Sequence, residues 1–131
     1  MKYVACTVGL LLLLGCSKEP GEGGKAEIRG RVMEQDHNAN GVPNGDPYLL
    51  MDKTVFIIYG DASDGAFPDD NVDTGPYGEF RFKWLRIGSY SVYVVSDCDD
   101  CDGGKKTVFA SVEVGDRKEV VDAGTLLVEK H

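Results

Sequence analysis

The sequence predicts an all-β protein whose mature part is a single antiparallel β-sandwich of about seven strands. Short runs of alternating apolar and polar residues recur from residue 28 onward, and such alternation is typical of half-buried strands. The chain contains 17 glycines, many of them between these runs, and no window of the mature part shows a sustained helical period. Several short strands separated by turn residues indicate a sandwich or a barrel.

The first 15 residues have the features of an export signal. Residues 8–14 form an apolar run that is too short to cross a bilayer, which needs about 20 residues. The run ends in Leu13-Leu14-Gly15-Cys16, which resembles the lipobox of bacterial lipoproteins. This resemblance implies cleavage before Cys16 and attachment of lipid to its thiol, so that the mature protein is held on a membrane. The alternative is an ordinary signal peptide with an unrelated cysteine.

Residues 16–25 are expected to form a lipidated, flexible tether, and residues 26–131 the sandwich domain. After Cys16 the tether contains only Ser, Lys, Glu, Pro and Gly, a composition that stays solvated. Ser17 after the lipidated cysteine resembles the signal that sends Gram-negative lipoproteins to the outer membrane, and Lys18-Glu19 resembles short surface-export signals. We therefore expect a lipid-anchored protein of the bacterial envelope, in the outer membrane, facing the periplasm or the cell surface.

The charge of the chain limits its partners. Its formal net charge is −8, and removal of the leader takes Lys2 away as well. An acidic chain repels phosphate backbones, so nucleic acid is not an expected partner. The same excess of carboxylates favours solubility or cation binding.

Two of the four cysteines remain for the folded domain. Cys6 leaves with the leader and Cys16 carries the lipid, so Cys98 and Cys101 are expected to pair in an oxidising compartment. A zinc site at this pair would need further ligands, and the chain has only two histidines. Thioredoxin-like chemistry would need a helix after the pair, and no helical pattern follows. We expect a local disulfide in a loop.

The expected strands are defined by their alternating residues. In chain order these are Ile28, Gly30 and Val32; Val55, Ile57 and Tyr59; Phe80, Phe82 and Trp84; Tyr90, Val92 and Val94; Val108, Ala110, Val112 and Val114; and residues 120–128, interrupted at Ala123-Gly124. The run from Val55 to Tyr59 is apolar on both faces, which predicts a central strand.

Residues 78–92 (GEFRFKWLRIGSYSV) resemble the core of prealbumin-like sandwiches. These are the carboxypeptidase regulatory-like domains and the related Cna-B-type and Sdr B-type repeats. The resemblance implies a Greek-key sandwich, and most members are non-catalytic spacers, accessory modules or binding modules. The spacing fits a core in which five side chains point inward around a turn at Gly88: Phe80, Phe82, Leu85, Tyr90 and Val92.

The segment DHNANG at residues 36–41 is a candidate calcium loop. Calcium loops place oxygen ligands at positions 1, 3 and 5 and a glycine at position 6. The predicted ligands are Asp36, Asn38, Asn40, the carbonyl of Val42, Asn44 and Asp46. Pro47 stands where a bidentate Glu belongs. The segment also resembles the loop of Sdr B-type repeats with one residue deleted, and the alternative is a plain turn.

Two acidic segments form a second candidate. If successive strands run antiparallel, the loops after the second and fourth expected strands meet at one end, with the Asp36 loop at the other. The predicted divalent-ion cluster there is Asp69, Asp70, Asp73, Asp99, Asp100 and Asp102, with Asp61, Asp64 and Asp97 nearby. A solvated acidic end is the alternative.

No catalytic motif stands out. The chain has no GxSxG, no HExxH and no phosphate-binding glycine loop. Four aromatic residues could form a glycan platform, Trp84, Tyr77, Phe67 and Tyr48, although the alternation places Trp84 in the core.

We therefore expect a non-catalytic, lipid-anchored envelope or cell-surface module, with calcium as a candidate stabilising ion. Its expected partners are the membrane, through the lipid, and a protein or glycan that the sequence does not name. Two other interpretations stay open: a calcium-binding or other divalent-ion-binding lipoprotein, and a hydrolase or hydrolase accessory.

Overall fold

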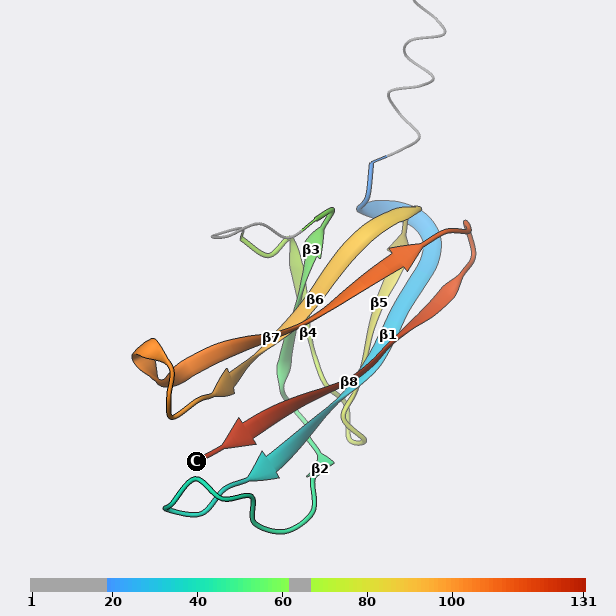
Figure 1. Ribbon diagram of the computed structural model, residues 1–131. Helices are drawn as coiled ribbons and strands as arrows, with labels where there is room; N and C mark the ends of the chain where they lie inside the picture. Colours follow the sequence, from blue (N-terminus) through green and yellow to red (C-terminus); the bar gives the residue numbers. More distant parts are fainter. Residues whose placement is uncertain (1–18, 62–66) are drawn as a thin grey trace, which may run out of the picture.

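The computed structural model describes residues 19–61 and 67–131. The expected signal peptide, the lipobox with Cys16, and Asp64 lie outside these residues. Within them the chain forms eight strands and the 3-10 turn η1 (Asp102–Gly104). The strands are β1 (Glu22–Asp36), β2 (Tyr48–Leu49), β3 (Thr54–Tyr59), β4 (Asp70–Asp73), β5 (Glu79–Leu85), β6 (Gly88–Asp97), β7 (Lys105–Val114) and β8 (Val120–Lys130) (Figure 1).

Two four-stranded sheets pack against each other, which confirms the predicted all-β sandwich. In one sheet β1 pairs with β2, β5 and β8, and the other has the order β4-β3-β6-β7. The central position predicted for the Val55–Tyr59 run is confirmed, because β3 lies between β4 and β6. There are eight strands in the described residues rather than about seven. The added ones, β2 and β4, are two and four residues long and have no apolar alternation.

One pair of strands departs from the expected antiparallel arrangement. β1 and β8 run parallel, from Glu27 opposite Val120 to Asp36 opposite Lys130. The chain can do this because β7 carries it back to the end of the sandwich where β1 starts. β8 has a one-residue bulge between its partners Arg29 and Arg31, and Gly124 there takes a φ of +84°. This bulge is the interruption visible in the sequence.

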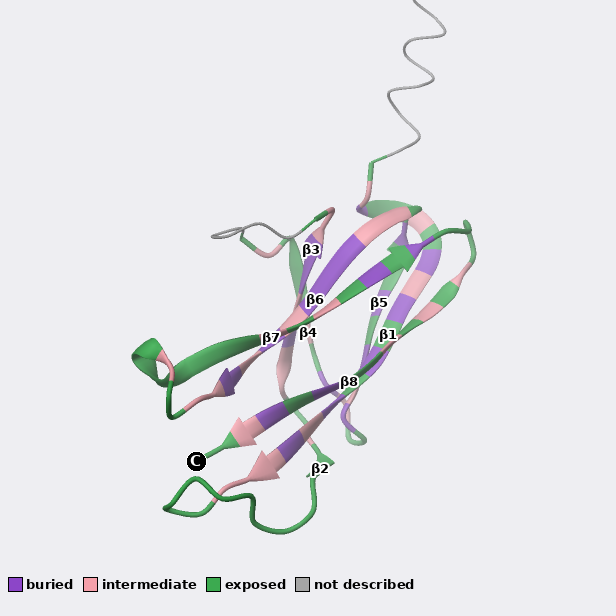
Figure 2. Cartoon of the chain, viewed as in Figure 1, coloured by how far each residue is buried: buried purple, intermediate pink, exposed green. Residues whose placement is uncertain are grey.

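The alternating residues build one core between the sheets (Figure 2). The inward positions predicted for residues 80–92 are confirmed, since each of these side chains is at most 3% exposed: Phe80, Phe82, Leu85, Tyr90 and Val92. Phe80, Phe82 and Leu85 come from the β1 sheet, which also contributes Ile28, Val32, Leu126 and Val128, and Tyr90 and Val92 come from the other sheet. Burial of this apolar surface is the main force that holds the sandwich together.

Trp84 does not follow the predicted pattern. Its side chain is 66% exposed, although alternation with Phe80 and Phe82 placed it in the core. The reason is local, because the backbone of Trp84 adopts a left-handed φ of +62°. This turn shifts the alternation by one residue, so that Leu85 faces the core instead.

The strand directions define two ends of the sandwich. At the tether end, Gly21 accepts a hydrogen bond from the Arg86 backbone and Gly60 donates to Ser89. At the far end, Asp97 pairs with Lys105 across the β6–β7 hairpin and Asp36 lies beside Lys130. Figure 1 shows that the chain enters the sandwich at the tether end. The loop after β1 and the C-terminal residue lie at the far end.

The first strand begins earlier than expected. β1 starts at Glu22, so residues 22–25 of the expected tether lie in the sheet. Glycine permits this, because a Cβ at Gly24 would lie 2.0 Å from the carbonyl oxygen of Leu85. No helix within the described residues is long and apolar enough to span a membrane.

Candidate functional site

The predicted calcium loop is closed by its own hydrogen bonds. The Asn38 side-chain oxygen accepts the backbone N–H groups of Asn40 (2.9 Å) and Val42 (3.0 Å), which makes an Asx turn. The Val42 carbonyl accepts the N–H of Asn38, and Asp36 Oδ1 accepts the hydroxyl of Tyr48 at 2.9 Å. Asn44 donates its N–H to the Asp36 carbonyl. Several of the proposed ligand oxygens are thus already engaged within the loop, and calcium binding stays a prediction.

The predicted acidic cluster is divided between the two ends of the sandwich. The prediction that these aspartates form one divalent-ion site is therefore wrong. Tyr59, at the end of β3, lies opposite Tyr90 at the start of β6, whereas Asp99 follows the far end of β6. Asp69 and Asp70 therefore lie at the tether end, and Asp99, Asp100 and Asp102 at the far end. The cause is β4, an additional strand antiparallel to β3, which ends in Asp73 and changes the direction of every later strand relative to the prediction.

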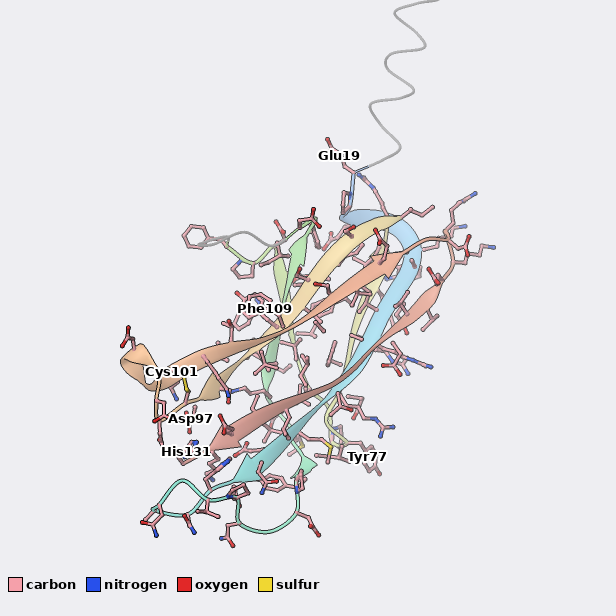
Figure 3. The ribbon with its side chains drawn as sticks, viewed as in Figure 1. Glu19, Tyr77, Asp97, Cys101, Phe109 and His131 are labelled. Atoms are coloured by element: carbon pink, nitrogen blue, oxygen red, sulfur yellow. A yellow bond between two sulfur atoms is a disulfide. The ribbon has the colours of Figure 1, made fainter. Side chains whose placement is uncertain are left out.

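The Asp36 loop and the Asp99 loop lie at the same end, contrary to the prediction. A Cβ at Gly41 would be 3.7 Å from Asp99 Oδ2. Cys98 and Cys101 form the expected disulfide, with Cα atoms 5.4 Å apart, and it encloses Asp99 and Asp100 in a short loop. Figure 3 shows Cys101, Asp97 and His131 together at this end.

The outer face of the β1 sheet holds a polar hollow of about 410 Å³. Its charged residues carry both signs, with Arg31 opposite Glu79, and Arg29 between Arg81 on one side and Asp122 on the other. Paired charges of this kind are typical of a solvated strand face, and we assign no ligand to this hollow.

A row of three aromatic rings crosses the outer face of the β4-β3-β6-β7 sheet. Phe56 of β3 is the register partner of Tyr93 of β6, and Tyr93 is the partner of Phe109 of β7. The ring centroids are 5.0 Å apart for Phe56 and Tyr93, and 5.1 Å apart for Tyr93 and Phe109. Phe109 is 51% exposed and is labelled on β7 in Figure 3. We call these three residues the aromatic row.

The sheet geometry explains the position of the aromatic row. Side chains alternate between the two faces of a strand. The neighbours of the row on β3 and β6, Ile57, Val92 and Val94, are fully buried in the core, and those on β7, Val108 and Ala110, pack against it. The row must therefore face outward. Cross-strand aromatic pairs stabilise a sheet, and here they also leave Phe109 exposed to solvent and Phe56 and Tyr93 half-buried on the outer face.

Polar side chains surround the aromatic row. Asn71 of β4 extends it, as the register partner of Phe56. Toward the tether end a shallow hollow of about 200 Å³ is lined by Asp61, Ser89, Ser91, Ser111 and Glu113 together with Tyr90 and Val112. Ser89 donates its hydroxyl to Glu113 at 2.7 Å. Among the described residues no lysine or arginine lines this hollow, so the part of the outer face between the row and the tether end combines apolar rings with hydroxyl, amide and carboxylate groups.

The aromatic row is made of other residues than the glycan platform expected from the sequence. Trp84, Tyr77 and Phe67 are 66%, 71% and 88% exposed, yet they lie on separate segments, and Tyr48 is tied to Asp36. The signal for the row was present in the sequence, because Phe56, Tyr93 and Phe109 each occupy the outward position of an apolar run. The three rings line up only because of the register between β3, β6 and β7, and this register cannot be predicted from the sequence alone.

At the tether end, burial and the neighbouring carboxylates of Glu22, Asp70 and Asp69 raise the pKa of Tyr59 to about 12. Asp69 also accepts the backbone N–H of Tyr59 at 2.7 Å. The acidic segment after β3 is thus tied to the sheet beside the hollow rather than to the far end.

No family model matches this chain. No curated protein matches it either. Among solved structures, the chain is similar to a Pseudomonas aeruginosa protein described as a candidate carbohydrate binding protein, with a TM-score of 0.48 and 14% identity over 89% of this chain and 94% of that one. At this level the similarity carries no conclusion about function.

Proposed function

We propose that the protein is a non-catalytic, lipid-anchored module of the bacterial envelope that binds carbohydrate on the outer face of the β4-β3-β6-β7 sheet. The observation that carries this proposal is the aromatic row of Phe56, Tyr93 and Phe109. Its ring centroids follow one another at about 5 Å across three adjacent strands.

The row matches the chemistry of a sugar ring. A pyranose presents C–H groups on one face, and these pack on the flat face of an aromatic side chain, whose quadrupole is negative there. A row of three rings spans more than one sugar residue, which favours a chain over a monosaccharide. Rigid strands hold the rings in place, so that binding orders little of the protein.

The polar groups around the row define the class of glycan. Asn71, Ser111, Asp61 and Glu113 supply acceptors and donors for sugar hydroxyl groups. Because both charged residues that line this hollow in the described part of the chain, Asp61 and Glu113, are acidic, a sulfated, phosphorylated or uronic-acid-rich glycan would be repelled. We therefore assign a neutral oligosaccharide or polysaccharide as the ligand.

The lipid anchor is supported by the lipobox resemblance, and the fold is compatible with it. The chain enters the sandwich at the tether end, and β3, β6 and β7 extend between this end and the far end. The outer face of the sheet is therefore a side wall of the sandwich, which an anchored protein could present to a polymer lying along the envelope.

The test is binding of neutral glycans to the full chain in detergent. Glucan, chitin and mannan oligosaccharides would be titrated while the ring resonances of phenylalanine and tyrosine are followed by NMR. We expect saturable shifts with at least one glycan. Phe109→Ala and Tyr93→Ala should each weaken that binding at least about tenfold. The stacking of a nucleic-acid base on an aromatic side chain, a contact of similar area, contributes about 1–3 kcal/mol to binding.

Trp84→Ala is the matched control, because Trp84 is an exposed aromatic residue on the opposite sheet. It should leave the affinity unchanged. If none of the glycans bound, or if Trp84→Ala removed binding while Phe109→Ala did not, the proposed site would be wrong.

A further inference from the structure

The parallel pairing of β1 and β8 brings the only two histidines of the chain together. Gln35 is opposite Glu129 and Asp36 is opposite Lys130. His37 follows directly after β1, and His131 follows directly after β8. The backbone N–H of His37 donates a hydrogen bond to the Lys130 carbonyl at 2.9 Å. The imidazole rings stack with centroids 4.4 Å apart and planes 20° from parallel.

Glu129 completes a group of three ligand atoms. Its Oε1 lies 3.3 Å from His37 Nε2 and 4.0 Å from His131 Nε2. All three residues can offer ligand atoms within 4.8 Å of one another. In a tetrahedral zinc site with bonds of about 2.0–2.1 Å, neighbouring ligand atoms are about 3.3 Å apart. Side-chain adjustments of about an ångström or less would therefore bring the three atoms onto one ion.

The opposite nitrogen of each ring is already held, as in metal-binding histidines. His37 Nδ1 lies 3.1 Å from the Gln35 carbonyl oxygen, and in the tautomer that carries its proton on Nδ1 the Nε2 lone pair is available to a metal ion. His131 Nδ1 lies 2.9 Å from Asp99 Oδ2. A carbonyl or carboxylate on the second nitrogen orients the ring and raises its basicity as a ligand. The Cys98–Cys101 disulfide holds the loop that supplies Asp99.

The carboxylate is positioned as well. The backbone N–H of Glu129 donates to the hydroxyl of Ser96, which is 1% exposed, at 2.8 Å. Lys106 binds the other carboxylate oxygen, Oε2, at 2.8 Å, which leaves Oε1 directed at the histidines. The side chains of His37 and His131 are 7% and 16% exposed. A hollow lined by Asn40, Gly41, Asp100 and His131 gives an ion access to the group from solvent.

We propose that His37, Glu129 and His131 bind a divalent transition-metal ion of the zinc class at the far end of the sandwich. Two imidazoles and one carboxylate match the ligand preference of Zn²⁺ and of its neighbours Cu²⁺ and Ni²⁺. Three protein ligands leave one position open toward the hollow for water or a ligand from a partner. The site is separate from the aromatic row and does not depend on the proposed glycan binding.

The experiment is a zinc titration of the full chain in detergent, prepared without a polyhistidine tag and stripped of metal with a chelator. Calorimetry should show one Zn²⁺ per chain, and the imidazole C–H resonances of both histidines should shift together. Co²⁺ should give the visible absorption bands of a four- or five-coordinate site. The double variant His37→Ala/His131→Ala should lose these signals, and Glu129→Gln should weaken binding.

Two further variants separate a metal site from a structural cluster. Asp99→Asn should weaken zinc binding about 10- to 100-fold without abolishing it, because Asp99 acts through His131. Asp102→Asn, directly after the same disulfide, is the matched control, because Asp102 is exposed and lies outside the hollow, and it should bind like the unsubstituted chain. Absence of zinc binding by the unsubstituted chain, or undiminished binding by a double variant whose melting curve shows it to be folded, would overturn the proposal.

Discussion

The Tyr90 hydroxyl accepts a hydrogen bond from the backbone N–H of Gly21 at 2.9 Å and donates one to the Arg86 carbonyl at 2.7 Å. Tyr90 is 1% exposed, and its ring belongs to the core. One buried side chain thus joins the entry of the chain, the β5–β6 turn and the centre of the sandwich.

Tyr90→Phe tests the contribution of this hydroxyl. The substitution keeps the ring but leaves the buried N–H of Gly21 without its partner, so the free energy of unfolding should fall by about 1–2 kcal/mol. Urea denaturation measures this loss. Tyr93→Phe is the control, because no hydrogen bond of the Tyr93 hydroxyl is present among the described residues, and it should change stability by less than about 0.5 kcal/mol.

Gly30→Ala should destabilise the β1 sheet. A Cβ at Gly30 would lie 2.6 Å from Phe80 Cζ and 2.8 Å from the carbonyl oxygen of Gly124. The ring can shift, but the backbone at the β8 bulge cannot yield without disturbing the β1–β8 pairing, so we expect a loss of about 1–3 kcal/mol. At Gly115 the nearest atom would be 3.8 Å away, and Gly115→Ala should be nearly neutral. Equal thermal melts for the two variants would contradict this account.

Alkaline pH should weaken the fold through Tyr59. Its pKa in the folded state, about 12, lies above its ordinary value of 10.0. Stability from a raised pKa is fully present below pH 10 and is lost as the pH rises toward 12. The unfolding free energy should therefore decline across this window, and Tyr59→Phe should reduce the decline. Absorbance of tyrosinate, followed with circular dichroism, gives both quantities in one titration.

The calcium prediction has a direct test in the melting temperature with calcium and with a selective chelator. If the loop binds calcium, the oxygens of Asp36 and Asn38 must exchange their hydrogen bonds within the loop for the ion, and the melting temperature should rise by several degrees in a way that Asp36→Ala removes. No rise with calcium would contradict the predicted site.

Cys16→Ser tests the lipid anchor. Each buried methylene of an acyl chain contributes roughly 0.8 kcal/mol to membrane binding. Loss of the lipidated residue should therefore move the protein from the membrane fraction to the soluble fraction. Persistent membrane association of Cys16→Ser, measured by fractionation and immunoblotting, would show that the lipobox interpretation is wrong. Ser17→Ala leaves the cysteine in place and serves as the control.

Local patterns predicted most of the fold. The alternating runs at Tyr90–Val94 and Val108–Val114 define β6 and β7, because apolar side chains on one face of a strand must be buried. The four residues of β4 carry no such pattern, since Asp70, Asn71 and Asp73 are exposed and pair only because β3 lies beside them.

The two sites depend on relationships that a single sequence does not display. Phe56, Tyr93 and Phe109 become neighbours through the register of three strands, and a change of one residue in any strand would place its ring in the core. His37 and His131 lie almost at opposite ends of the described chain, and only the parallel direction of β8 joins them. From the sequence, zinc is considered only at the Cys98–Cys101 pair, which would need further ligands in a chain with two histidines.

The parallel pairing of β1 and β8 also has a mechanical consequence. If the start of β1 is held by a membrane and the end of β8 is pulled by something bound at the far end, the two strands are loaded in opposite directions along their length. All the hydrogen bonds between them then resist the force at once, in shear, whereas in an unzipping geometry they would break one after another. The strand pair that closes the sandwich is thus arranged as a clamp, suited to a protein that must keep its shape while under tension.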